Sequence, residues 1–226
     1  MKDKIVALLP MKGHSERIPN KNLKSFNGKP LYHHILNSLS SCSSINTIVI
    51  DTDSRDVITD VNENFNNIKF IERPVELRGD FVEMNDIIAY DLSQIEGEYF
   101  LQTHSTNPLL LSNTIDKAVN IFYKNIDKYD SIFTVTKFQN RFYDRKGVPI
   151  NHNLNELLRT QDLPPVFEEN SNLYIFSKTS FIKAGNKRIG FNPYMFKMDK
   201  LEAVDIDDMN DFILAELIMK ARKDKT

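Results

Sequence analysis

A segment rich in cationic side chains, residues 12–29, is the first place where this sequence could do chemistry. It holds five cations and one acid, namely Lys12, Arg17, Lys21, Lys24, Lys29 and Glu16. The apolar run at 5–9 predicts a buried strand before it, and apolar residues at helical spacing after Pro30 predict a helix behind it. Open α/β sheets bind ligands in loops past the carboxyl ends of strands, and cations with exposed backbone N–H groups suit a polyphosphate. A solvated basic surface loop is the alternative interpretation.

A pair of acids near the C-terminal end of the chain is the second candidate. Asp205 and Asp207 flank the apolar Ile206. Alternate residues of an extended segment face the same side, so the two carboxylates would converge while Ile206 points into the core. Such a pair suits Mg²⁺, which often binds through one or two carboxylates and substrate phosphates. The following Asp208 is expected to cap the last helix, with its buried side formed by Met209, Phe212, Ile213 and Leu217.

The elements that would position these residues alternate along the chain. Short apolar runs predict strands at 5–9, 45–51, 68–71, 98–102 and 130–137. Amphipathic segments predict helices after Pro30, after Asp53 or Ser54, after a capping box of Asp80 with Glu83, and after Ser112. The alternation indicates the α/β class, with a Rossmann-like, mostly parallel sheet flanked by helices. Asp51 and Asp53, at the end of the second strand, are expected to serve as turn and cap residues.

The length of 226 residues fits a single domain, residues 1–226. Within it, residues 138–168 show little helical periodicity and several turn residues, so they are expected to form an arm that leaves the sheet. This stretch holds too little periodic apolar sequence to bury itself, and a partner related by a twofold axis would order it.

Composition and charge argue against several kinds of protein. A net charge of −2 argues against a general binder of nucleic acids or anionic membranes. The lone cysteine, Cys42, excludes an intrachain disulfide and a cysteine-based zinc cluster, and it fits a reducing compartment. No signal peptide or membrane-spanning run is recognisable, so a cytoplasmic protein is expected.

The order of residues in the basic segment adds a resemblance. Ser15, Ile18, Pro19, Lys21 and Asn22 fall on the pattern Ala-Arg-x-x-Ser-x-x-(Ile/Leu)-Pro-x-Lys-Asn, and residues 27–31 match the block that follows. This run resembles the phosphate loop of the cytidylyltransferases that make CMP-activated sialic acids and related sugar acids. Lys12 stands where that family has an arginine, and lysine keeps the charge but loses the bidentate fork.

Three further blocks resemble the same family in the same order. The run from Arg73 to Asp80 is similar to Arg-Pro-x-x-Leu-x-x-Asp, whose arginine contacts the cytosine base. Gln102 matches a glutamine that faces the sugar acid, and His104, a departure from the family, is a candidate for substrate contact. The segment from Asp205 to Asp207 is similar to the metal-binding Asp-Ile-Asp motif.

The arm also carries a resemblance. Arg159 and Gln161 lie in a run similar to Arg-x-Gln-Asp-Leu-Pro, which implies an arm that packs across a homodimer partner and contributes to its sugar site. Glu168 stands where some bacterial members hold the sugar carboxylate with an arginine, and Ser171 replaces a usual glycine. The family also adds an antiparallel strand near the C-terminal end of the chain.

Taken together, the resemblance implies CTP-dependent activation of a sialic-acid-like 2-keto sugar acid, giving a CMP-sugar and pyrophosphate with Mg²⁺. It implies catalytic roles for Lys12, Lys21 and Asp207, and a nucleotide site of Lys12, Gly13, Ser15, Lys21, Asn22, Arg73 and Asp80. It also implies an acceptor site of Gln102, His104, Arg159 and Gln161, and a metal site of Asp205 and Asp207. Two alternatives stay open: another acceptor, such as a Kdo-like sugar or a phosphonate, and a nucleotide-binding paralogue that has lost catalysis.

Overall fold

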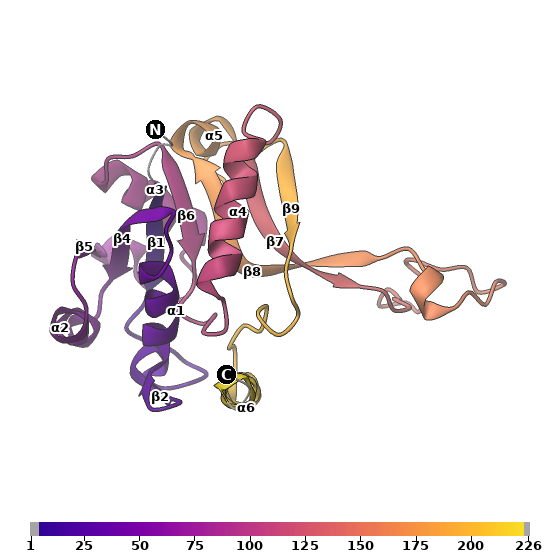
Figure 1. Ribbon diagram of the computed structural model, residues 1–226, viewed down its shortest axis with the longest axis horizontal. Coiled ribbons are helices and arrows are strands. Elements are labelled where there is room, and N and C mark those ends of the chain that lie inside the picture. Colours follow the sequence, from indigo (N-terminus) through magenta and orange to yellow (C-terminus); the bar gives the residue numbers. More distant parts are fainter. Residues whose placement is uncertain (1–4, 224–226) are drawn as a thin grey trace.

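The computed structural model describes residues 5–223, and its centre is a seven-stranded sheet (Figure 1). The strands lie in the order β5-β4-β1-β6-β8-β7-β9. Their bounds are Ile5–Met11 (β1), Ile45–Thr52 (β4), Ile68–Glu72 (β5), Tyr99–Thr103 (β6), Ser131–Phe138 (β7), Val166–Ser177 (β8) and Pro193–Lys197 (β9). All five strands expected from the sequence are present.

The sheet is mostly parallel, as predicted. Neighbouring strands run parallel from β5 to β6 and between β7 and β9, while β8 runs antiparallel to both of its neighbours. The chain moves outward from β1 to β4 and β5, then returns to place β6 on the other side of β1. This reversal leaves a crevice past the carboxyl ends of β1 and β6, where ligands bind in open α/β sheets.

Helices cover both faces of this sheet (Figure 1). Alternate residues of β1 explain why: Ala7 and Leu9 pack with α1 (Leu31–Ser40), α2 (Arg55–Asn64) and α4 (Ser112–Lys124), whereas Val6 and Leu8 pack with α3 (Met84–Gln94) and α5 (Lys178–Lys183). Among the helices of residues 5–223, none has the length and apolar character that crossing a membrane requires.

A third, smaller core fixes the basic segment to the C-terminal helix α6 (Met209–Lys223). The segment contains a hairpin of β2 (Ser25–Phe26) and β3 (Lys29–Pro30) that the sequence analysis did not predict. Its turn residues Asn27 and Gly28 have φ of 48° and 83°, which suits the Asn-Gly turn typical of two-residue hairpins. Asn27 donates from its backbone N–H to a carboxylate oxygen of Glu216 over 3.0 Å, so the hairpin docks on α6.

The arm leaves the body as a paired extension of β7 and β8 and lies at the right of Figure 1. Beyond the pair of Phe138 with Val166, the described residues form one isolated bridge, Tyr143 with Pro149, and a 3-10 turn, Thr160–Asp162. The arm is therefore β-rich at its base and irregular at its tip.

Two local predictions were wrong. Helix α3 begins at Met84 without a side-chain cap, and Asp80 bonds to Lys12 instead of forming a capping box with Glu83.

In α6 the buried side chains are Phe212 and Ala215, whereas Met209, Ile213 and Leu217 are exposed. The reason is that α6 lies at the edge of the domain and packs through one narrow face, so apolar periodicity alone did not identify its inner side.

Candidate active site

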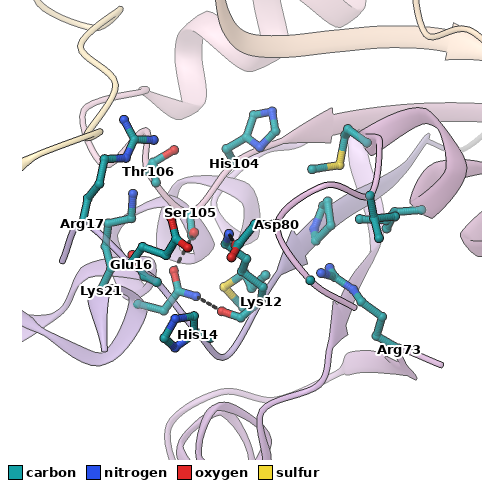
Figure 2. A pocket seen from close by; sticks show the side chains of 18 residues that line it. Lys12, His14, Glu16, Arg17, Lys21, Arg73, Asp80, His104, Ser105 and Thr106 are labelled. Atoms are coloured by element: carbon teal, nitrogen blue, oxygen red, sulfur yellow. Dashed lines mark hydrogen bonds and ion pairs between the residues drawn. The ribbon is translucent and has the colours of Figure 1, made fainter. Parts of the chain in front are cut away.

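A cavity of about 390 Å³ lies past the carboxyl ends of β1 and β6 (Figure 2). Its walls come from the loop after β1, the loop after β5 and the start of α3, and the loop after β6. The sequence-predicted residues that line it are Lys12, Ser15, Lys21, Asn22, Arg73, Asp80 and His104. Segments far apart in the chain therefore meet at the crevice that the sheet topology creates.

Lys21 and the acidic pair are brought together across the whole length of the chain. The ammonium group of Lys21 donates to the backbone carbonyl of Ile206 over 2.8 Å. Burial lowers the pKa of Lys21, although the nearby charges of Asp205 and Asp207 oppose this shift. On the solvent side, Arg17 forms an ion pair with Asp207 at 2.7 Å.

The two acids have different environments, which bears on metal binding. Ile206 is fully buried between them, as predicted. Asp205 is half-buried and accepts hydrogen bonds from the Thr106 side chain and the Ile206 backbone, and a long one, 3.4 Å, from the side-chain amide of Asn107. Burial raises the pKa of Asp205, and the charge of Asp207 adds to this rise while Thr106 opposes it.

The pair therefore fits a hard divalent cation, which would relieve the repulsion between the carboxylates. Among the described residues no group of three or more metal-ligating side chains occurs. Such an ion would accordingly need further ligands from water or phosphate oxygens.

The start of the basic segment is held in place by the turn after β4. The backbone N–H of Gly13 donates to the Asp53 carboxylate over 2.6 Å. A Cβ at position 13 would lie 3.1 Å from Cβ of Ser54, so glycine permits this close approach. The cap of α2 is Ser54, whose hydroxyl accepts from the backbone N–H of Val57.

Lys12 and Asn22, both predicted to bind nucleotide, make contacts within the protein. Lys12 forms a short ion pair with Asp80 at the cavity wall. Asn22 donates to the carbonyl of Lys12 over 2.9 Å and accepts from the hydroxyl of Ser105 over 2.7 Å. Asn22 thus joins the loops after β1 and β6.

Arg73 is the predicted base-reading residue, and it is almost completely buried, with 3% of its surface exposed. Its Nε forms a short ion pair with Asp51, and it also lines the cavity. Asp51 is therefore the counter-ion of Arg73, and the prediction that it acts as a turn or cap residue was wrong. The sequence did not reveal this ion pair, because nothing in the residues around Asp51 shows that its side chain faces the loop after β5.

A third member of this buried group, Asp91, comes from α3. Asp91 is 1% exposed, and neither of its carboxylate oxygens accepts a hydrogen bond from the described residues. Burial raises the pKa of Asp91 strongly, and the charge of Asp51 and a hydrogen bond with it add to the rise. Asp91 is accordingly protonated at neutral pH, and its carboxyl group hydrogen-bonds to the Asp51 carboxylate.

The loop after β6 is linked to a residue that the sequence analysis missed. Gln102 is fully buried and its side-chain oxygen accepts from Nη1 of Arg188 over 2.5 Å. Arg188 lies between α5 and β9, in a stretch without a recognisable motif, and no signal in the sequence marked it. Burial, with the charge of Arg188, lowers the pKa of His104 to about 3, so its imidazole is neutral.

The arm residues predicted to contact the acceptor lie elsewhere. Arg159 forms an ion pair with Asp162 at 2.7 Å, beside the 3-10 turn that contains Gln161. No described residue of the arm lines the cavity of its own chain. Their role toward a partner's acceptor site stays a prediction.

Comparison with known proteins agrees with this geometry. The profile of the cytidylyltransferase family matches residues 6–217. The chain belongs to the cytidylyltransferase family. The chain is 24% identical to an N-acylneuraminate cytidylyltransferase of Streptococcus agalactiae, over 93% of the chain and 52% of that protein. It is also 24% identical to a pseudaminic acid cytidylyltransferase of Campylobacter jejuni, over 96% of the chain and 97% of that protein.

The chain spans about half the length of the N-acylneuraminate cytidylyltransferases it matches. Among solved structures, a CMP:2-keto-3-deoxy-manno-octonic acid synthetase in complex with CTP has a TM-score of 0.69 at 13% identity, covering 97% of this chain and 99% of its own. A 4-diphosphocytidyl-2C-methyl-D-erythritol synthase from Anaerococcus prevotii has a TM-score of 0.68 at 15% identity, covering 96% and 99%. These likenesses show that the chain shares the fold of these two proteins.

The protonated Asp91 generates a prediction about stability and pH. Because its pKa is raised in the folded state, the folded protein holds a proton that the unfolded chain releases above about pH 4. Its stabilising contribution is thus complete at acid pH and decreases as the pH rises, by up to about 1.4 kcal/mol per pH unit. Asp91→Asn should flatten this dependence, measured as urea midpoints at pH 5, 7 and 9.

The exposed Asp86 on the same helix provides the control. Asp86→Asn should keep the slope of the unmodified protein. If Asp91→Asn has that slope as well, the buried carboxyl is not the proton-binding group.

Proposed function

We propose that the protein transfers CMP from CTP to a sialic-acid-like 2-keto sugar acid, releasing pyrophosphate. The observation that carries this proposal is that Lys21, which lines the cavity, meets the segment of Asp205 and Asp207 through the carbonyl of Ile206. The names of the sequence relatives support a sugar-acid acceptor, because they act on N-acylneuraminate and pseudaminic acid.

In the proposed reaction, the anomeric hydroxyl of the acid attacks the α-phosphorus of CTP. The new oxygen–phosphorus bond forms as the bond to pyrophosphate breaks, and Asp207 accepts the hydroxyl proton. Lys12 and Lys21 offset the negative charge of the phosphates. No covalent intermediate with the protein is required, since positioning and electrostatics can carry this kind of transfer.

The nucleotide end would use the wall that holds Lys12, Gly13, Ser15, Asn22, Arg73 and Asp80. Lys12 is partly exposed, so a phosphate group could replace Asp80 as its partner. Arg73 is fixed by Asp51 and presents an oriented guanidinium to a base. Asp205 and Asp207 would hold Mg²⁺, which supplies further charge neutralisation on the phosphates when bound.

One observation favours a different acceptor as the second candidate. Glu168 is exposed on β8 and adds negative charge where an arginine would suit a sialic acid carboxylate. A Kdo-like acid or a phosphonate is therefore the alternative acceptor for the same CTP-dependent reaction.

Pyrophosphate release tests the proposal and separates these acceptors. The protein would be incubated with CTP, Mg²⁺ and each of a panel of acids: N-acetylneuraminate, pseudaminate, Kdo and simple phosphonates. Release with a sialic-acid-like acid and CTP, and not with ATP or GTP, is expected. Release with only Kdo or a phosphonate would select the alternative, and CTP binding without release from any acid would indicate a non-catalytic paralogue.

The half-buried Lys21 gives the first mutational prediction. Lys21→Ala removes a charge-assisted contact in a partly dry cleft, so turnover should fall by roughly 10²–10³-fold. Lys29 is exposed and does not line the cavity, so Lys29→Ala is the matched control and should be nearly silent. Lys24 is unsuitable as a control because its ammonium group lies over the ring of Phe212. Equal losses for the two variants would contradict the role of Lys21.

The acidic pair, Asp205 and Asp207, gives the second mutational prediction. Asp205→Asn keeps the shape and removes one charge, so activity should fall by orders of magnitude and recover partly at high Mg²⁺. Asp208 accepts from the backbone N–H groups of Asn210 and Asp211 and caps α6, as predicted. Asp208→Asn should therefore be nearly silent, since asparagine caps as well as aspartate. Normal turnover of Asp205→Asn at low Mg²⁺ would show that the pair is structural.

A homodimer is part of the proposal, and the arm supports it. Leu154 and Leu157 are 68% and 91% exposed near the tip of the arm, and an apolar surface of this kind suits burial against a second copy. In the dimer, Arg159 and Gln161 would contribute to the partner's acceptor site.

Sedimentation at micromolar concentration is expected to give a dimer, and Leu157→Glu should shift it toward monomer. Val75→Glu, at an exposed apolar residue of the body, is the control. A monomer in the unmodified protein would exclude this assembly.

A cytoplasmic location also belongs to the proposal. Cys42 is buried, and its burial raises the pKa of the thiol to about 12, so the cysteine is unreactive and compatible with a reducing compartment.

A further inference from the structure

Behind the cavity wall, three side chains form a hydrogen-bonded series, here named the donor chain: Arg188, Gln102 and His104. Arg188 reaches β6 from the segment before β9, and its guanidinium lies 4.0 Å from the ring centre of Tyr174. Gln102 joins Arg188 to His104, and His104 lines the cavity.

The direction of each hydrogen bond in this chain is fixed by chemistry. Arginine can only donate, so the oxygen of the Gln102 amide must face Arg188. The amide nitrogen donates to the backbone carbonyl of Thr103 over 2.8 Å, which can only accept. Its second N–H points to Nε2 of His104 at 3.1 Å, so Nε2 accepts and the remaining proton of the imidazole lies on Nδ1.

All donors in the chain therefore point the same way, from Arg188 toward His104. The Nδ1–H of His104 has no acceptor among the described residues. His104 itself lines the cavity. A positive charge at the base of aligned donors polarises them and favours a negative group at the open end. The donor chain of Arg188, Gln102 and His104 thus has the electrostatics of an anion site.

Charge balance around the cavity supports this interpretation. Of the lining cations, Lys12 is paired with Asp80, Arg17 with Asp207 and Arg73 with Asp51. Lys21 donates to the carbonyl of Ile206 and feels the charges of Asp205 and Asp207. Arg188 differs: it is half-buried, and no described carboxylate lies within 4.0 Å of its guanidinium. The charge of Glu169 acts on it, but that carboxylate accepts from the hydroxyl of Tyr174. A half-buried cation without a bound counter-ion is costly unless a ligand supplies one.

The anion site lies apart from Lys21, one of the two lysines expected at the phosphates. Figure 2 shows His104 on the other side of Ser105 from Lys21 and Arg17. Strand β8, which pairs with β6 here, contains no lysine or arginine in Val166–Ser177. The positive charge that acts on His104 is that of Arg188, which contacts Gln102.

We propose that His104, oriented by Arg188 through Gln102, donates a hydrogen bond to the carboxylate of the acceptor acid. This inference rests on the proposed function. His104 is the contacting residue, and Arg188 is a positioning residue that fixes its tautomer and supplies charge from behind. The site would select acids over neutral sugars of the same shape.

The first experiment measures steady-state kinetics with the acid varied at saturating CTP. His104→Ala and Arg188→Met should each raise KM for the acid by roughly 10–100-fold, the range for a lost hydrogen bond to a charged group, and leave KM for CTP unchanged. Both variants should lose discrimination between the acid and its carboxamide, and Arg188→Lys should recover part of it. The exposed neighbour Lys187 gives the control, Lys187→Met, which should behave as the unmodified protein.

The second experiment does not depend on turnover. Nitrogen NMR of the histidines, assigned by comparison with His104→Gln, should show His104 as the Nδ1–H tautomer and neutral down to pH 5, in line with its pKa of about 3. In Arg188→Met its pKa should rise but stay below the ordinary histidine value, because burial is the larger cause of the shift. A folded Arg188→Met with unchanged KM for the acid, or an Nε2–H tautomer, would overturn this inference and leave CMP transfer intact. Absence of pyrophosphate release from the unmodified protein would instead overturn the proposed function. The NMR measurement of the His104 tautomer would then still test the direction of the hydrogen bonds from Arg188 to His104.

Discussion

The backbone of Ile206 is the point on which the site depends. Its N–H donates to the carbonyl of Thr106 over 3.0 Å, its carbonyl accepts from Lys21 over 2.8 Å, and its side chain is fully buried. Three loops, following β1, β6 and β9, are thereby held to one residue. Because both polar groups and the side chain of Ile206 are occupied, the flanking Asp205 and Asp207 have little freedom in where they lie. The acidic pair is placed by packing, and its carboxylates are left for other partners.

The buried ion pair beside this crevice joins residues of different elements. Arg73, after β5, is balanced by Asp51 at the end of β4, and Asp91 of α3 stays protonated beside them. Removing the charge of one member would leave another buried and uncompensated, which is costly. The cavity wall that holds Arg73 and the sheet beneath it are therefore stabilised together by one group of charges.

Much of the fold and part of the site could be predicted from the sequence. Apolar runs identified all five expected strands, and the order of motifs placed Lys21 and Asp207 in one site because loops at the carboxyl ends of strands converge. The exposed side of α6 could not be predicted, because apolar residues occur around most of that helix. Arg188 was missed for another reason: its contacts with Gln102 and Tyr174 arise from strand pairing between β6 and β8, and nothing local in its segment records that pairing. The ion pair of Asp51 with Arg73 is hidden in the same way.

The hairpin of β2 and β3 has a consequence for ligand capture. Asn27 is tied to Glu216 of α6, Gly13 to Asp53, and Asn22 to both Lys12 and Ser105, so the long basic segment is anchored at its start, middle and end. A free loop of this length would lose backbone and side-chain conformational entropy on closing around a ligand. Here folding has already removed most of that freedom. A ligand entering the crevice meets a preorganised surface, and a larger share of its contact energy is available as affinity.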